Sequence, residues 1–169
     1  MITHKNGDIF TTELHAIGHG VNCRGVMGSG IAVAVKNKYP DVYKAYKDHC
    51  EHVGMSGGDL LVVQSQVDEK YIFNLASQED TGANASYDWL RESVHKALQF
   101  CEDQGLPSLA LPRIGSRIGG LEWENVLAIL EEESNKFPQI ELELWSYEEL
   151  PEEYWKSPEN RKIYRENAK

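Results

Sequence analysis

Short apolar runs alternate along this chain with longer segments in which apolar side chains recur at helical spacing. The runs predict β-strands at residues 16–23, 59–66, 71–77, 108–114 and 140–147. Several of them are apolar throughout, which is typical of strands that are covered on both faces. The turn-forming pairs Gly57-Gly58 and Asp68-Glu69 precede the second and third strands, so these two strands are predicted to form a hairpin.

Helices are predicted at residues 29–38, 42–52, 87–104 and 122–134, with Pro40-Asp41 between the first two. In the third helix, Ser86 suits the N-cap and Gly105 suits the left-handed position just after the last turn. Its apolar stripe consists of Leu90, Val94, Ala97, Leu98 and Cys101. Because strands and helices alternate without a repeat or a linker, the fold class is predicted to be α/β. We expect a three-layer α/β/α sandwich with a mixed, mostly parallel central sheet.

The end of the chain differs in composition from the rest. Residues 148–169 are rich in Glu, Lys and Arg, and their few apolar side chains are irregularly spaced. We therefore expect one domain over residues 1–147 and a charged, helical tail over residues 148–169 that packs on the domain. A solvated tail and a contact with a partner are the alternatives.

Composition restricts the classes of function. The chain has 169 residues, 41% of them apolar, which fits one ordinary globular domain. Its N-terminus lacks an apolar segment, so we expect neither a signal peptide nor a membrane partner. Three cysteines without paired spacing predict reduced thiols, a cytoplasmic location and no metal site, and we expect no cofactor. The net charge of −10 disfavours direct binding to a nucleic-acid backbone, but backbone amides can still bind a small anion.

Two glycine-rich loops, at residues 22–32 and 112–121, contain the main candidate chemistry. Each follows a predicted strand and leads into a predicted helix. A strand, a glycine loop and a helix N-terminus together direct several backbone N–H groups at one point, where a phosphate is favoured. Two such loops at one edge of a sheet can hold a diphosphate between them, which indicates a nucleotide derivative as the ligand.

Neither loop fits a common phosphate-binding motif. No Gly-Lys-Ser/Thr follows either loop, and Gly25, Gly28 and Gly30 reverse the spacing of the dinucleotide fingerprint. A structural role is the alternative for each loop taken singly, since glycines also serve tight turns and close helix packing. The pair, each with its own strand and helix, favours ligand binding. A different nucleotide enzyme on an α/β scaffold stays open, because a fold does not determine a function.

The order and spacing of these motifs resemble the macro domain family over residues 1–147. The resemblance depends on Gly7-Asp8-Ile9, on Asn22-Cys23 with the loop that follows, and on Pro112-Arg113-Ile114-Gly115 with Gly119-Gly120-Leu121-Glu122-Trp123. The chain is most similar to the branch that contains Poa-type ADP-ribose 1″-phosphate phosphatases and terminal ADP-ribose protein glycohydrolases. This resemblance implies ADP-ribose or an ADP-ribose derivative as the ligand, with ADP-ribosylated macromolecules as further candidate partners.

The resemblance also implies roles for individual residues. Asp8 would recognise adenine, or be a surface-turn aspartate, and Asn22 would face the distal ribose, or brace its loop. Arg113 would reinforce the diphosphate or pair with a carboxylate in the fold, and Tyr147 would stack on adenine or pack against the tail. The full ligand-binding set that we expect is Asp8, Ile9, Asn22, Gly25, Val26, Met27, Gly28, Ser29, Gly30, Ile31, Gln78, Pro112, Arg113, Ile114, Gly115, Ser116, Arg117, Ile118, Gly119, Gly120, Leu121 and Tyr147.

Catalytic residues are less clearly marked. The glycohydrolases of this branch use a lysine after the third strand and an aspartate in the second glycine loop. This chain has Gln78 at the lysine position, with Glu79 as the alternative alignment, and Gly119 at the aspartate position. Glutamine forms no covalent amine adduct and glycine carries no proton, so the lysine-dependent route is not expected. The remaining catalytic candidates are Asn22, His19, Asp80 and Ser116, with structural roles as the alternative for His19 and Asp80. We therefore hypothesise a hydrolase of ADP-ribose 1″-phosphate or a related ADP-ribose derivative; a non-catalytic module that binds or sequesters ADP-ribose is the alternative.

Overall fold

A single six-stranded sheet forms the centre of the part of the chain that the computed structural model describes, residues 1–116 and 119–146. The strand order is β1-β6-β5-β2-β4-β3. The strands are β1 (Ile2–Asn6), β2 (Ala16–Gly20), β3 (Leu60–Gln64), β4 (Tyr71–Leu75), β5 (Ser108–Leu111) and β6 (Glu141–Ser146). Every neighbouring pair is parallel except β3 and β4, which are antiparallel neighbours as predicted. The prediction of a mixed, mostly parallel sheet is confirmed.

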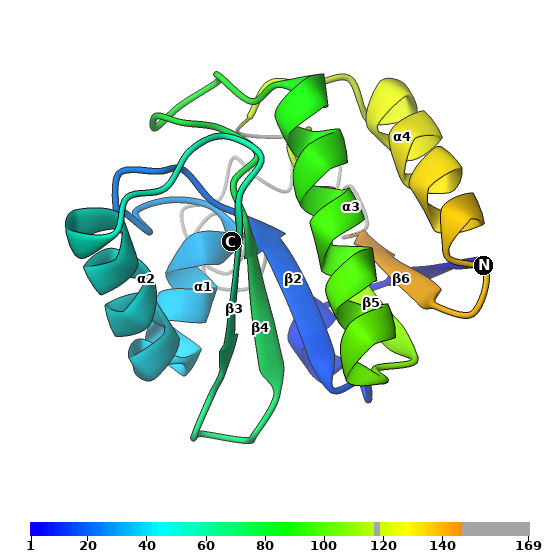
Figure 1. Cartoon of the computed structure of the whole chain (residues 1–169), viewed down its shortest axis with the longest axis horizontal. Coiled ribbons are helices and arrows are strands. Elements are labelled where there is room, and N and C mark those ends of the chain that lie inside the picture. Colours follow the sequence, from blue (N-terminus) through cyan, green and yellow to red (C-terminus); the bar gives the residue numbers. More distant parts are fainter. Residues whose placement is uncertain (117–118, 147–169) are drawn as a thin grey trace, which may run out of the picture.

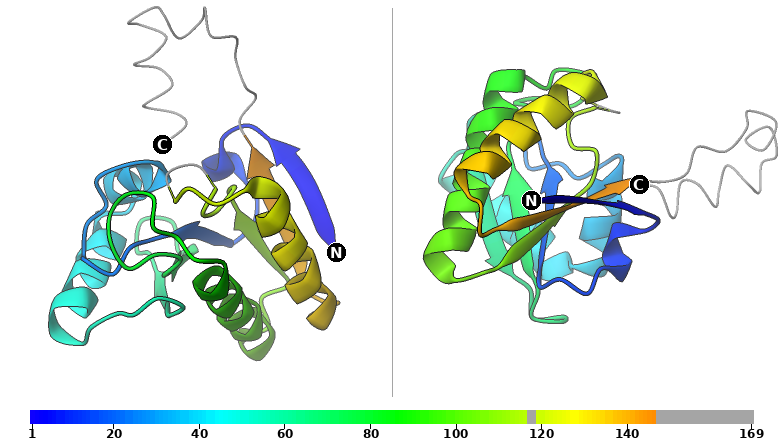
Figure 2. Two further views of the ribbon diagram at one scale, coloured as in Figure 1. Left: turned by 90° about the horizontal axis from the view of Figure 1, so that it is seen from above. Right: turned by 90° about the vertical axis from the view of Figure 1, so that its right-hand side faces the viewer.

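Helices cover both faces of this sheet (Figures 1 and 2). The helices are α1 (Ile31–Lys38), α2 (Pro40–His52), α3 (Tyr87–Gln104) and α4 (Trp123–Lys136), and η1 (Ile9–Thr11) is a short 3-10 helix. The apolar side chains of α1 and α2 join one buried cluster, and those of α3 and α4 join another on the opposite face. This arrangement is the predicted three-layer α/β/α sandwich.

Helix α3 illustrates how the sequence determines an element. All five residues of its predicted apolar stripe are fully buried. Ser86 accepts a hydrogen bond from the backbone N–H of Trp89, and Gly105 has a φ of 69°, in the left-handed region. Both the N-cap and the residue that ends the helix are therefore as predicted. Full burial of a side chain the size of Leu90 contributes roughly 1.5–3 kcal/mol to folding.

Strand β1 was not predicted from the sequence. It is an edge strand that pairs only with β6, and three of its five residues are exposed. No layer covers His4 and Lys5, so polar side chains are tolerated at these exposed positions. The strand therefore lacks the apolar pattern of a buried strand.

Several element ends differ from the prediction by two or three residues. β2 ends at Gly20 and β5 at Leu111, three residues earlier than predicted, because the chain turns there into the glycine loops. α1 begins at Ile31, two residues late, since Gly30 has a φ of 64° and a ψ of −151°, which no helix contains. α2 begins two residues earlier than predicted, at Pro40. Proline is tolerated at this position because backbone N–H groups in the first turn have no partner within the helix, so its missing N–H costs nothing.

The expected tail at residues 148–169 and Tyr147 lie outside the described residues, as do Arg117 and Ile118. Within the described ranges, no helix combines the length and the apolar character that a membrane crossing requires.

Candidate functional site

A cavity of about 760 Å³ lies at the carboxyl ends of the parallel strands. This volume is within the range of small-molecule sites, and the carboxyl edge is where open α/β sheets bind ligands. The lining residues follow β1, β2, β4, β5 and β6. They are Gly7, Ile9, Gly20, Val21, Asn22, Val26, Gly28, Ser29, Gly30, Ile31, Ala32, Ser77, Gln78, Thr81, Gly82, Pro112, Arg113, Ile114, Gly115, Gly119, Trp145 and Ser146. Both glycine loops therefore line one cavity.

The first glycine loop presents unpaired backbone donors next to a helix N-terminus. No described residue accepts a hydrogen bond from the backbone N–H groups of Gly28, Ser29 and Gly30. Gly30 is the N-cap of α1, whose first turn contains no acidic residue. Free amides and the helix dipole together favour an anion at this point.

The second glycine loop is folded tightly on itself. Gly115 has a φ of 76°, and its carbonyl accepts a hydrogen bond of 2.9 Å from the N–H of Leu121. A Cβ atom on Gly119 would lie 2.6 Å from the Gly115 carbonyl oxygen and 2.8 Å from the Ala85 Cβ atom. Glycine at position 119 is thus required by the protein's own packing, before any ligand is considered.

Asn22 lines the cavity at the end of β2, and its side chain is bonded within its own loop. Its Nδ2 donates to the Val26 carbonyl oxygen (2.8 Å), and its Oδ1 accepts from the Arg24 N–H (2.9 Å). The hydroxyl of Tyr46 on α2 lies 2.7 Å from the Asn22 carbonyl oxygen and 2.8 Å from its Oδ1. The loop-bracing interpretation of Asn22 is therefore visible in the structure, and one N–H of the amide is left for a ligand.

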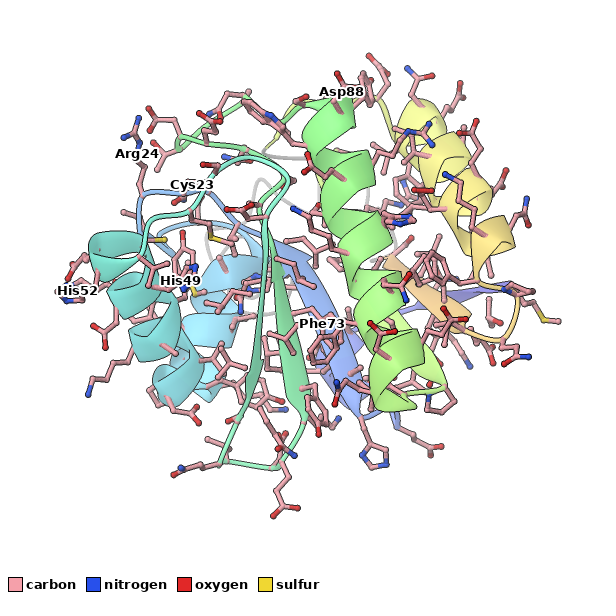
Figure 3. The ribbon with its side chains drawn as sticks, in the orientation of Figure 1. Cys23, Arg24, His49, His52, Phe73 and Asp88 are labelled. Atoms are coloured by element: carbon pink, nitrogen blue, oxygen red, sulfur yellow. The ribbon has the colours of Figure 1, made fainter. Side chains whose placement is uncertain are left out.

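The loop after β4 closes the same end of the cavity. Gln78 donates from Nε2 to the carbonyl oxygens of Asp80 (2.6 Å) and Gly82 (3.0 Å). Asp80 itself forms an exposed ion pair of 3.3 Å with Arg24 and does not line the cavity. Figure 3 shows Cys23 and Arg24 near the C-terminal end of α2, which carries His49 and His52. The catalytic candidate Asp80 therefore faces solvent and pairs with an arginine of the first loop.

The opposite end of the cavity lies where β1 and β6 end. Gly7, Ile9 and Trp145 line it, and the Trp145 indole N–H donates to Glu143 over 2.8 Å. Asp8, between two lining residues, accepts a hydrogen bond of 2.9 Å from the Phe10 N–H and so caps η1. This geometry matches the turn-aspartate alternative, and the adenine role of Asp8 stays a prediction.

Arg113 is the charged side chain of the cavity wall among the described residues. Its Nε donates to the Ser146 hydroxyl over 2.9 Å, and its guanidinium lies 5.0 Å from the ring centre of Trp123. No described carboxylate pairs with it. A held guanidinium without an acidic partner can bind a phosphate oxygen or a ribose hydroxyl.

His19 lies in the core and not at the cavity. It is fully buried in β2, and burial lowers its pKa from 6.5 to about 4. Its Nε2 lies 2.7 Å from Oδ1 of Asn74, while Nδ1 has no partner among the described residues. This placement matches the structural alternative for His19.

Ser116 and Cys23 are also bonded inside the fold. The Ser116 hydroxyl donates to the Arg113 carbonyl oxygen (2.9 Å), and the Cys23 thiol lies 3.4 Å from the Gln78 carbonyl oxygen. Burial, followed by the neighbouring Cys50, raises the pKa of Cys23 to about 12, so its thiol stays protonated at neutral pH. Neither side chain lines the cavity.

Other residues of the expected ligand-binding set also lie away from the cavity wall. The Cα of Gly25 faces α2, where a Cβ would lie 3.5 Å from the Cys50 Cβ, and Met27 is buried beneath the loop. Gly120 and Leu121 belong to the second loop without lining the cavity. The sequence interpretation did not include the lining residues Gly7, Gly20, Val21, Ala32, Ser77, Thr81, Gly82, Trp145 and Ser146.

The signal for most of these missed residues is their place at a strand end. Trp145 and Ser146 close β6, and Ser77 follows β4 by two residues, at the edge where parallel strands all end. The carboxyl-edge rule would have selected them once the strand order was known, and a sequence does not state that order.

The fold and the cavity define an α/β protein with a nucleotide-sized site at the carboxyl edge of its sheet. Residues 19–130 match the sequence model of the Macro domain family, and the chain belongs to that family. It is 32% identical over 134 residues to the Bos taurus ADP-ribose glycohydrolase OARD1, covering 78% of this chain and 82% of that protein. It is 30% identical over 143 residues to a Mycobacterium tuberculosis DNA ADP-ribosyl glycohydrolase, covering 83% of this chain. The match spans only 41% of that relative's length.

Two further comparisons agree with this assignment. An ADP-ribose 1″-phosphate phosphatase of Scheffersomyces stipitis is 26% identical over 168 residues, covering 81% of this chain and 97% of that protein. The solved macrodomain of Mycobacterium tuberculosis DarG superposes with a TM-score of 0.81 at 28% identity, over 86% of this chain and 97% of that one.

Proposed function

We propose that this macro domain binds ADP-ribose, or a derivative substituted at the terminal ribose, along the carboxyl edge of its sheet. The observation that carries the proposal is that two glycine loops, far apart in sequence, line one cavity of about 760 Å³. The relatives named as ADP-ribose glycohydrolases and as an ADP-ribose 1″-phosphate phosphatase support the same ligand.

The order of the strands suggests how such a ligand lies. Adenine occupies the β1 and β6 end, near Ile9 and Trp145, and the diphosphate lies between residues 28–31 and the second loop. The terminal ribose then reaches the β2 and β4 end, beside Asn22 and Gln78. In this placement the unpaired amides of the first loop bind phosphate oxygens, which requires no basic protein surface.

We assign to this site the hydrolysis of ADP-ribose 1″-phosphate or a related ADP-ribose derivative. With the 1″-phosphate, one water is consumed, and ADP-ribose and inorganic phosphate are released. Among the described residues, no lysine and no carboxylate lines the cavity, so a covalent lysine route has no nucleophile there. Positioning of the substrate and stabilisation of charge by backbone amides are what the site offers a bound substrate.

The second candidate is a non-catalytic ADP-ribose-binding module. The observation that favours it is the same scarcity of reactive groups: among the described residues, the polar side chains of the wall are amides, hydroxyls, the Trp145 indole and Arg113. Asn22 and Gln78, the two amides, are both bonded within the protein.

The two candidates are separated by measuring binding and turnover on the same preparations. Calorimetry with ADP-ribose tests binding, and release of inorganic phosphate from ADP-ribose 1″-phosphate tests hydrolysis. Asn22→Ala should reduce phosphate release, whereas Asn37→Ala, at an exposed position of α1, is the matched control and should not. Binding without release above background would favour the module, and absence of binding would contradict both candidates.

A further inference from the structure

We propose that Tyr46 of α2 is a positioning residue for the first glycine loop. It holds the amide of Asn22 so that this side chain offers the terminal ribose one N–H donor and no acceptor. This inference rests on the proposed function, because it concerns the end of the cavity where the terminal ribose is placed.

The orientation of the Asn22 amide follows from its partners. The Arg24 backbone N–H is a donor and must face Oδ1, and the Val26 carbonyl is an acceptor and must face Nδ2. An amide oxygen has two acceptor sites, and the Arg24 N–H occupies one of those at Oδ1. The Tyr46 hydroxyl lies 2.8 Å from Oδ1 and 2.7 Å from the Asn22 carbonyl oxygen, so its single proton is shared between these two oxygens. The hydroxyl therefore occupies the second acceptor site of Oδ1, and one N–H of Nδ2 is left.

Tyr46 is suited to hold this arrangement. Its side chain is fully buried in the apolar layer between α2 and the sheet, so its hydroxyl has no access to bulk water. A buried hydroxyl is costly unless it is hydrogen-bonded, and the two oxygens of Asn22 lie within 2.8 Å of it, beside the weaker acceptor Cys50 one helical turn along α2. Burial also raises the pKa of Tyr46, which keeps the hydroxyl a proton donor.

The contact also attaches the loop to a rigid element. Asn22 bridges Arg24 and Val26, and Gly25 between them has a φ of 78° and approaches α2 at Cys50. Tyr46 lies one helical turn before Cys50 on the same helix. The first glycine loop, which forms part of the cavity wall, is thus hydrogen-bonded at its first residue to the buried face of α2.

Tyr46→Phe removes only the hydroxyl, and the chain offers a matched control. Tyr39 is also fully buried in the same apolar layer, and its hydroxyl donates over 2.7 Å to Asp68, which does not line the cavity. Tyr46→Phe should raise the Kd for ADP-ribose about tenfold, the effect of one lost hydrogen bond. Tyr39→Phe should leave that Kd within about twofold, although it loses a hydrogen bond of similar length.

Two further measurements connect the effect to Asn22. In an Asn22→Ala background, Tyr46→Phe should weaken binding by less than about twofold, because coupled residues are not additive. Without ligand, hydrogen exchange at the Arg24 backbone amide should be faster in Tyr46→Phe than in wild type, and unchanged in Tyr39→Phe.

The outcomes are distinguishable from a failure of the proposed function. If the wild type binds no ADP-ribose, the proposed function fails, and the exchange at Arg24 still decides whether Tyr46 positions the loop. Faster exchange with unchanged ADP-ribose affinity would overturn the assignment of Asn22 as a ligand donor. Equal behaviour of Tyr46→Phe and Tyr39→Phe in both measurements would overturn the positioning role.

Discussion

The buried imidazole of His19 affects the stability of the fold, although its strand ends at the proposed binding cavity. His19 lies in the central strand β2 beside Asn74, whose Nδ2 donates to the Leu61 carbonyl oxygen over 3.1 Å. The Asn74 Oδ1 is therefore the acceptor in its pair with His19, and His19 Nε2 carries the proton. The other ring nitrogen has no partner within residues 1–116 and 119–146, which matches a neutral imidazole.

The burial of His19 makes the stability of the fold depend on pH. Burial lowers the pKa of His19 from 6.5 to about 4, so the unfolded chain binds a proton that the folded chain excludes between those values. Its stabilising contribution is fully present above pH 6.5 and is lost as the pH falls towards 4. The loss corresponds to roughly 3 kcal/mol in the free energy of unfolding.

Urea unfolding at several pH values between 7 and 4, on wild type and two variants, checks this expectation. His19→Gln should flatten the pH dependence because it removes the titrating ring, whereas the exposed His15→Gln should keep the wild-type slope. A wild-type slope that persists in His19→Gln would show that other groups cause it.

Gly28 of the first loop and Gly119 of the second loop differ in the space that is available for a side chain. A Cβ on Gly28 would meet only the Val26 side chain, at 3.4 Å, whereas a Cβ on Gly119 would lie 2.6 Å from a backbone oxygen. Gly28→Val should therefore fold normally and place its methyl groups in the cavity. We expect it to weaken ADP-ribose binding by at least about 100-fold with Tm changed by roughly 2 °C or less.

Gly119→Val should instead destabilise the fold, since either the loop or Ala85 must move. Overpacking of this kind costs about 1–3 kcal/mol, so a Tm lower by several degrees is expected in a thermal melt. Full ADP-ribose affinity in both variants would contradict the placement of the diphosphate between the two loops.

The sequence predicts helices and strands best where buried apolar residues recur at a regular spacing. The stripe of α3 was predicted because buried positions repeat along the helix, and the β3–β4 hairpin was predicted from two apolar runs with turn-forming pairs before them. The exposed edge strand β1 has neither signal. The cavity was predicted through its glycine loops. Trp145 and Ser146 were missed, because their contribution depends on β6 lying between β1 and β5, and nothing local to them states this.

At the scale of the whole molecule, the net charge bears on whether the protein binds nucleic acid itself in addition to a small ADP-ribose ligand. The chain has a net charge of −10, while its relatives include proteins named DNA ADP-ribosyl glycohydrolase. A nucleic-acid backbone is bound mainly through basic side chains that release counterions. We therefore expect a Kd for unmodified duplex DNA weaker than about 10⁻⁴ M at physiological salt. Fluorescence anisotropy at two salt concentrations measures this, and tight binding that weakens steeply with salt would contradict it.

The increase in Tm caused by a bound ligand tests the proposed contacts along the whole carboxyl edge of the sheet, from β1 to β4. ADP-ribose at 100 times its Kd should stabilise the folded state by about 2.7 kcal/mol, which raises Tm by roughly 5–11 °C in a domain of this size. AMP spans only the adenine end and one phosphate, so at equal concentration its shift should be smaller. Gly28→Val should reduce the shift at the same ADP-ribose concentration to about 2 °C or less, because the obstruction lies where the diphosphate is placed. If instead ATP or NAD gives the largest shift in the wild type, the site was built for another nucleotide, and the position assigned to the terminal ribose at Asn22 is wrong.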